Sequence, residues 1–223
     1  MDEISALTER MASIKRQLRL IVLLDAAKRS GLSPLQVRRV HAIAYLTNVL
    51  TPVWNMIPLD GKLLKQRRGP FYPDLQMDLD HLVGIGLVHI LNVRHVLNEG
   101  GIWQLEGDYS INQKFAAPIL AELERYPEEM RSHTFISELF LALSGLPDDE
   151  IDEAFRQDAT FADPIVDDNN VIDFGEWRSA NASANAAEFF RFASSAGALT
   201  TPGEKLHLYV SHLHSRLTEA HAK

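Results

Sequence analysis

The stretch RRGPFYPDLQMDLDHLVGIGLVHI, residues 67–90, decides the fold that this chain is expected to adopt. The Gly-Pro pair near its start is typical of a turn, and leucines then recur at helical spacing over residues 73–86. A GxGL break at 84–87 ends the predicted helix and leads into an apolar, strand-like segment. The helix carries Asp74, Asp78 and Asp80 and no Lys or Arg.

Two further helices are expected before this stretch. The first runs from about residue 5 to residue 30, with RLIVLLDAAKRSG as its buried half and Gly31 as a natural stop. The second covers residues 33–50, because Ser33 suits the N-cap and Pro34 suits the first helical position. Residues 51–62 contain two prolines and a glycine and are predicted to form a loop.

A β-hairpin is expected after the quoted stretch, with strands at LVHILNVRHVL and IWQL around the turn signal NEGG at 98–101. Three helices followed by a hairpin are the order of a winged-helix domain, whose third helix is placed to enter a DNA groove. We therefore predict a mostly helical α+β chain. A winged-helix domain with a β-hairpin wing, including the N-terminal helix, is assigned to residues 1–111, with its framework at 16–110.

The second half of the chain, residues 112–223, is predicted to be a helical bundle. It contains an alanine-rich helix, SANASANAAEFFRFASS, and a last helix that Thr201 and Glu204 open as a capping box. Residues 159–177 lack periodicity and are predicted to form a surface loop.

Composition places the chain among ordinary globular proteins and excludes several classes of site. Cysteine is absent, which excludes disulfides, thiolate metal sites and a cysteine nucleophile. The N-terminal residues have no apolar core like that of a secretory signal. The longest strongly aliphatic run, residues 20–24, is far shorter than the ~20 residues of a membrane span. A cytoplasmic location is therefore expected.

The net charge of −8 is divided unevenly between the two parts of the chain. Residues 1–70 carry a charge of +7, and residues 71–223 carry −15. Such a division indicates either two faces with different partners, one of them a polyanion, or two ordinary solvated surfaces. The candidate phosphate contacts are five cations just before the third helix and in the predicted wing: Lys62, Lys65, Arg67, Arg68 and Arg94.

The third helix itself argues against base recognition. Asp74, Asp78 and His81 are expected to share the face opposite the leucines, where two carboxylates would be repelled by phosphates. This face is instead a candidate binding site for a basic protein partner, and the alternative is a face that is merely solvated.

No catalytic, metal or cofactor site is expected. His207, His214 and His221 recur every seven residues, about 10.5 Å apart along a helix, which is too far for two of them to share an ion. A calcium loop aligned on Asp167 places Ile172 where glycine is required. The chain also lacks the glycine-rich nucleotide-binding motifs and the nucleophile elbow. A protein that is not an enzyme, with no cofactor and no small-molecule substrate, is favoured.

Residues 16–90 resemble a group of bacterial winged-helix accessory proteins through LLDAA, HAIAYLTN and RRGPFYPDLQMDLDHLVGIGLV. The family is the middle component of ABC three-component systems, including the small subunit of Lamassu-type defence systems; the Panacea antitoxins are a second likeness. The resemblance implies an adaptor that joins an SMC-like or ABC-type ATPase to an effector nuclease in defence against phages or plasmids. The alternative is a free winged-helix DNA binder, either a transcription regulator or an antitoxin.

Overall fold

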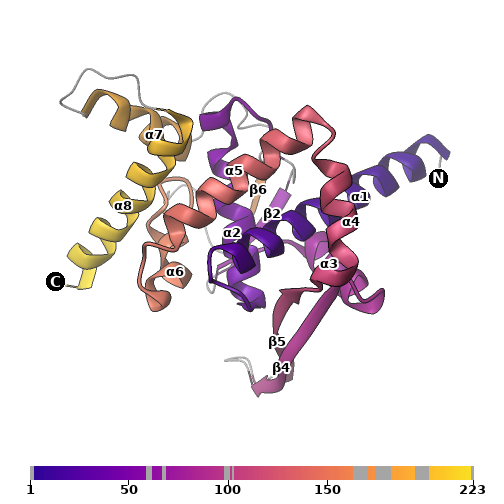
Figure 1. Ribbon diagram of the computed structural model, residues 1–223. Coiled ribbons are helices and arrows are strands. Elements are labelled where there is room, and N and C mark those ends of the chain that lie inside the picture. Colours follow the sequence, from indigo (N-terminus) through magenta and orange to yellow (C-terminus); the bar gives the residue numbers. More distant parts are fainter. Residues whose placement is uncertain are drawn as a thin grey trace. The chain divides into compact units, whose positions relative to one another are not determined.

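A computed structural model describes residues 3–58, 62–66, 69–97, 101, 103–162, 170–173, 182–193 and 201–221. The chain is mostly helical, as the sequence predicts (Figure 1). The described residues also form two small antiparallel sheets, and the sequence predicts the hairpin of the first sheet but not the second sheet. In the part of the chain that is described, no helix combines the length and the apolar character that crossing a membrane requires.

The chain divides into two units that do not follow the expected boundary at 111/112. Unit 1 comprises Met1–Val40 with Pro73–Thr134, and unit 2 comprises His41–Tyr72 with Phe135–Lys223. Residues 41–72 belong with the C-terminal part because strand β2 (Lys62–Gln66) pairs with strand β6 (Val171–Asp173), more than a hundred residues later.

Unit 1 is built from helices around a three-stranded sheet. Its elements are α1 (Glu3–Arg29), β1 (Leu35–Gln36), the start of α2 (Val37–Leu50), α3 (Pro73–Gly84), β4 (Val88–Leu97), β5 (Trp103–Ile111), α4 (Gln113–Leu123) and the start of α5 (Pro127–Leu143). The strands lie in the order β1-β5-β4, all antiparallel.

Helix α1 ends as predicted and helix α2 does not begin as predicted. Gly31 has φ 79°, and the amide of Leu32 donates to the carbonyl of Ala27, which closes the C-terminus of α1. The expectation that Ser33 caps α2 is wrong, because the next two residues pair with β5 as strand β1 and the helix begins at Val37. The Ser33 hydroxyl instead donates to Ser110 Oγ at 3.1 Å.

The hairpin of β4 and β5 is long and changes register once. Leu97 is opposite Trp103 at one end and Val88 is opposite Ile111 at the other. The register shifts between Leu91 and Arg94, where Asn92 has φ 50° and its amide donates to Asp108 Oδ2 at 2.7 Å.

Unit 2 combines the rest of α2 and α5 with helices and a second sheet in the order β3-β2-β6. Its other elements are η1 (Thr51–Trp54), β3 (Gly69–Phe71), α6 (Asp148–Ala154), η2 (Phe155–Gln157), α7 (Ala182–Ala193) and α8 (Pro202–His221). The predicted capping box of α8 is confirmed, since the Thr201 amide donates to Glu204 Oε2 at 2.6 Å and the Glu204 amide donates to Thr201 Oγ1 at 3.2 Å.

The predicted surface loop at 159–177 is only partly correct for the residues that are described. Residues 159–162 form a turn, and Ala162, Asn170 and Val171 are exposed, but other residues of the segment are buried. Thr160 is fully buried and Ile172 is 1% exposed in strand β6. A strand of three residues is too short to show a period in the sequence, and its pairing with β2 is fixed by distant residues. Residues 163–169 and 174–177 of that segment lie outside the described residues.

Candidate functional site

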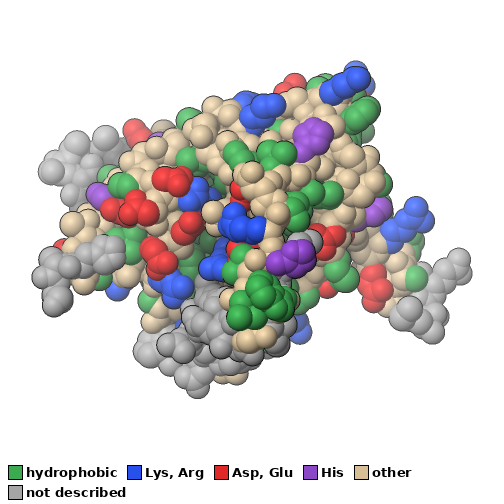
Figure 2. Space-filling view, turned by 90° about the horizontal axis from the view of Figure 1, so that it is seen from below, with side chains coloured by type: hydrophobic (Ala, Val, Ile, Leu, Met, Phe, Trp, Pro, Cys, Tyr) green, Lys and Arg blue, Asp and Glu red, His purple; other side chains and the backbone are tan. Residues whose placement is uncertain are grey.

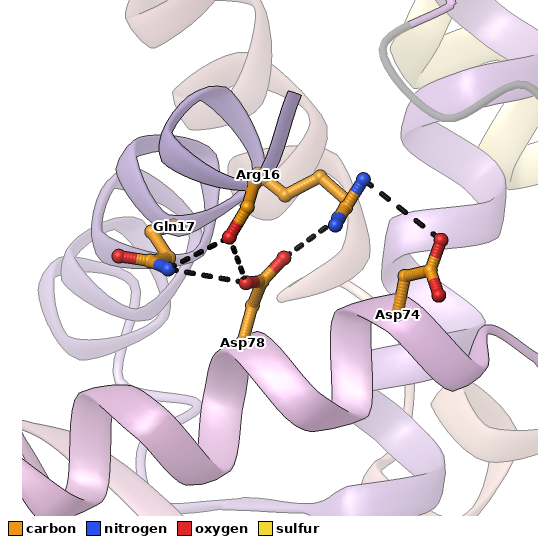
Figure 3. Close-up of polar contacts among 5 residues, drawn as sticks. Arg16, Gln17, Asp74 and Asp78 are labelled. Atoms are coloured by element: carbon orange, nitrogen blue, oxygen red, sulfur yellow. Dashed lines mark hydrogen bonds and ion pairs between the residues drawn. The ribbon is translucent and has the colours of Figure 1, made fainter. Parts of the chain in front are cut away.

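The acidic side of helix α3 is bound by helix α1 of the same unit. Asp78 Oδ2 lies 2.6 Å from Arg16 Nε, and Asp78 Oδ1 accepts bonds from Ser13 Oγ at 2.5 Å and Gln17 Nε2 at 3.1 Å (Figure 3). Ser13, Arg16 and Gln17 recur at helical spacing and therefore reach Asp78 from one side of α1. We call these four residues the Asp78 cluster.

The expectation that Asp78 is presented to a partner is wrong. The residue is 5% exposed, and its carboxylate is occupied by three side chains of α1. The expectation that Asp78 lies opposite the leucines is wrong as well. At about 100° per residue, Asp78 is only about 40° from Leu82 and about 60° from Leu75 around the axis of α3, so it borders the buried side, and the sequence does not reveal that another helix lies there. The Asp78 carboxylate therefore attaches α1 to α3 and is not available to a partner.

The other two residues of the predicted partner face are exposed. The side chain of Asp74 is 67% exposed, and its Oδ2 lies 4.0 Å from Arg16 Nη1, at the limit of an ion pair. His81 is also exposed, and Met77 on the same helix is 64% exposed. The exposed surface of α3 therefore has one fewer acid than predicted and an exposed apolar side chain in addition.

Two of the predicted phosphate contacts lie in β2 and differ in exposure. Lys62 is exposed, and its Nζ lies 3.3 Å from Asp173 Oδ2 on the neighbouring strand. Lys65 is only 8% exposed, and its Nζ lies 5.1 Å from the centre of the Phe161 ring. The prediction that Lys65 contacts phosphates is therefore corrected, because the strand turns its side chain into unit 2. Arg67 and Arg68 lie outside the described residues.

Arg94 lies on the hairpin of unit 1 and shares a carboxylate with a second arginine. Glu106 Oε1 is 2.5 Å from Arg38 Nη2, and Glu106 Oε2 is 3.4 Å from Arg94 Nη2. Glu106 is opposite Arg94 in the ladder of β4 and β5, so both side chains are on the same face of the hairpin. The carboxylate offsets part of the positive charge that Arg94 would offer to a phosphate.

A second buried carboxylate, Asp158, is the centre of a cluster in unit 2 that the sequence does not predict. Asp158 is 0% exposed, and its oxygens accept from the hydroxyls of Tyr45, Tyr209 (2.6 Å) and Ser183 (2.8 Å). The amides of Thr160 and Phe161 donate to Oδ1 at 3.0 and 3.1 Å. These bonds join α2, α7 and α8 to the segment after η2, and no substrate role is required to explain them.

Burial is the main cause of a raised pKa at both tyrosines of this cluster. The pKa of Tyr45 lies well above its usual value because the hydroxyl is buried and because the negative charge of Asp158 is adjacent. The same two causes, in the same order, raise the pKa of Tyr209. Both hydroxyls therefore stay protonated near neutral pH and remain donors to Asp158.

Two histidines of α8, His207 and His214, are paired with acids of other helices. His214 Nδ1 lies 2.5 Å from Glu150 Oε2 in α6, and His207 Nε2 lies 3.6 Å from Glu138 Oε2 in α5. The side chain of His221 is outside the described residues. Over the described ranges, no three His, Asp or Glu side chains come together in a way that could hold a metal ion.

His133 of α5 gives a test of pH dependence. Burial, followed by the adjacent Arg29 guanidinium, lowers the pKa of His133, while Asp25 at 3.9 Å acts in the opposite sense. The folded-state pKa is below that of the unfolded chain, so the neutral ring contributes stability at pH above about 6.5 that is lost as the pH falls through the folded-state pKa. Urea unfolding of His133→Gln should therefore depend less on pH between 7.5 and 5.5 than that of the unmodified protein.

The control for this experiment is His89→Gln, because His89 is exposed on β4. That variant should retain the pH dependence of the unmodified protein. Equal pH dependence in His133→Gln and in the unmodified protein would contradict the assignment to His133.

Comparison with known proteins finds no similar protein. No family model matches the chain, and neither a curated protein nor a solved structure matches it. Three features of the chain itself bear on its function: the Asp78 cluster, the exposed surface of α1 and α3, and the hairpin.

Proposed function

We propose that this protein is a cytoplasmic, non-catalytic adaptor subunit that joins an SMC-like or ABC-type ATPase to an effector nuclease in bacterial defence against phages or plasmids. The observation that carries the proposal is the attachment of α1 to α3 through Asp78, together with the absence of Lys and Arg from α3. A helix whose outer side is partly covered and otherwise acidic is poorly suited to a DNA groove. Protein binding explains these features better.

A winged-helix framework for residues 16–110 is part of this proposal. The order α1, β1, α2, α3, β4, β5 and the sheet order β1-β5-β4 support it, because a winged helix has the same succession and a short first strand beside the hairpin. The insertion of η1, β2 and β3 between α2 and α3 is a departure from that plan. In this interpretation α3 occupies the position of the recognition helix.

The hairpin also favours a protein partner. Leu97 and Trp103 are opposite each other in the ladder and are 53% and 65% exposed. Figure 2 shows the molecule from below the view of Figure 1, and hydrophobic side chains lie on that face among charged ones. Exposed tryptophan and leucine on a protruding element are typical of protein interfaces, where aromatic anchors contribute most of the binding energy.

The test is a tagged purification from the native host, with the partners identified by mass and the eluate sized. We expect co-elution with an SMC-like or ABC-type ATPase at a fixed stoichiometry, and weak, salt-sensitive DNA binding at most. Trp103→Ala should reduce the recovery of that ATPase, whereas Tyr126→Ala, at an exposed aromatic residue of unit 1 outside the hairpin, should not.

A lone homodimer that binds one palindromic DNA site would overturn the proposal and favour a regulator or antitoxin. In that case Arg67→Ala combined with Arg68→Ala should weaken operator binding, because cations next to the recognition helix would then contact phosphates.

A further inference from the structure

The N-terminal half of α1 carries an apolar stripe that its own unit does not bury. Leu7, Met11 and Ile14 are 63%, 49% and 41% exposed, and Leu18 is half-buried. Their spacings of four, three and four residues are those of alternating a and d positions in a heptad repeat. We call Leu7, Met11, Ile14 and Leu18 the α1 stripe.

The end of α1 that carries this stripe extends beyond the rest of unit 1. Every residue from 5 to 12 is exposed. Figure 1 shows the N-terminal end of α1 continuing past α3 and α4. An isolated helix of this length would be only marginally stable in water. Here the exposed half is continuous with a buried half that begins at residue 19.

The Asp78 cluster fixes the direction in which the stripe points. Ser13, Arg16 and Gln17 contact Asp78 from one side of α1, and Ile14 and Arg16 are separated by about 200° around the helix axis. The polar side of α1 is therefore packed on α3, and the apolar side is directed away from it. This is the reverse of the usual arrangement, in which a helix buries its apolar side against its own domain.

The charges beside the stripe define its partner. Arg10 and Lys15 occupy the flanking g and e positions, both are exposed, and the contacts of the described residues include no ion pair for either. A second parallel copy of the chain would place Arg10 opposite Lys15 of its neighbour. An antiparallel copy would offer Thr8, Arg10, Lys15 and Gln17 over residues 8–17, none of them acidic. A different helix with acidic residues at its e and g positions would form ion pairs with both Arg10 and Lys15.

A membrane surface is a poorer match than a helix. The apolar surface is a narrow seam of a and d positions, whereas helices that lie on membranes have a wide apolar face with aromatic residues. The first eighteen residues contain no Phe, Tyr or Trp.

We infer that the α1 stripe forms a short coiled coil with an α-helix of another subunit, whose own a and d positions are apolar and whose e and g positions are acidic. This inference deepens the proposed adaptor function, because it gives one of the partner contacts a location and a chemistry. The Asp78 cluster acts as the anchor that holds the docking helix in place.

The first experiment measures the binding of the full-length protein to two synthetic four-heptad peptides with Ile and Leu at a and d. One peptide has Glu at every e and g position, and the other has Lys there. We expect the Glu peptide to bind about tenfold or more tightly than the Lys peptide. Arg10→Glu combined with Lys15→Glu should reverse that preference.

Two further variants separate the seam from the rest of the helix. Leu7→Ser combined with Ile14→Ser should weaken binding of the Glu peptide about 100-fold, because two apolar side chains leave the interface. Glu9→Gln, on the opposite side of the exposed helix, should leave binding unchanged. Circular dichroism of each variant checks that the chain stays folded.

Several results would overturn the inference. Equal binding of the two peptides, or an unchanged preference after the charge reversal, would contradict the claim that the partner helix is acidic at e and g. Self-association that the Leu7 and Ile14 substitutions abolish, without peptide binding, would identify a second copy as the occupant. Binding to vesicles of anionic lipid instead of either peptide would identify a membrane.

The native purification separates a failure here from a failure of the adaptor function. If the ATPase co-elutes equally with the unmodified protein and with the Leu7→Ser, Ile14→Ser variant, the α1 stripe is not the contact and the adaptor function stands. If the ATPase is absent from both preparations, the adaptor function itself fails.

Discussion

Asp158→Ala should lower the free energy of unfolding by about 3–5 kcal/mol, which is the largest effect that we expect from a single substitution in this chain. The carboxylate is fully buried and accepts from Tyr45, Tyr209, Ser183 and two backbone amides. Alanine removes this shared acceptor from all five donors. The Thr160 amide and the Ser183 hydroxyl keep their contacts with Ser183 Oγ and Thr160 Oγ1, respectively. Urea unfolding at pH 7, followed by tryptophan fluorescence and circular dichroism, measures the change.

Three tyrosine variants determine how the cluster contributes. Tyr45→Phe and Tyr209→Phe each remove one donor and should cost about 1–2 kcal/mol. Tyr126→Phe is the matched control, because Tyr126 is 55% exposed and outside the cluster, and it should change stability by less than about 0.5 kcal/mol. A loss below about 1 kcal/mol for Asp158→Ala would show that the cluster is not a main support of unit 2.

The predictable part of the fold is the part that local pattern determines. Apolar spacing locates α1 and α3, and Gly31 marks the end of α1 because only a residue tolerant of positive φ suits that position. The alternation and turn signal of the hairpin predict β4 and β5 in the same way.

The parts that sequence reasoning missed depend on contacts between distant residues. The pairing of β2 with β6 moves residues 41–72 into the second unit, and no local signal in either short strand predicts it. Asp158 is an ordinary acid in the sequence, and its side-chain donors lie 25 to 113 positions away. Burial of a polar residue becomes predictable only when its partners are known.

The Asp78 cluster also depends on contacts between residues far apart in the sequence, but one feature of the sequence of α1 could have indicated it. The periodicity of α3 puts Asp78 at the border of the leucine side, about 60° from Leu75, and it leaves open whether solvent or another helix covers that border. The N-terminal half of α1 has a heptad stripe on one side and Ser13, Arg16 and Gln17 on the other. A polar triad at helical spacing opposite an apolar seam indicates that the polar side is the one attached to the domain.

Asp78→Ala should lower the free energy of unfolding by about 2–4 kcal/mol, because it leaves the partly buried Arg16 guanidinium with only the exposed and more distant carboxylate of Asp74. The side chains of Arg16 and Asp78 are 18% and 7% exposed, so water compensates only part of the loss. Asp74→Ala is the matched control on the same helix. Its carboxylate is 67% exposed and lies 4.0 Å from Arg16, so its removal should cost less than about 0.5 kcal/mol.

A double-mutant cycle with Arg16→Ala isolates the contact between the two side chains. We expect a coupling energy of about 1–3 kcal/mol for Arg16 with Asp78, and one near zero for Arg16 with Asp74. Amide hydrogen exchange should become faster over residues 5–17 in Asp78→Ala and stay slow in the buried half of α1, because the anchor is lost while the core contacts remain. If exchange over residues 5–17 is unchanged, the Asp78 cluster does not hold the N-terminal half of α1. The direction of the α1 stripe would then have to be set by the buried half of the helix alone.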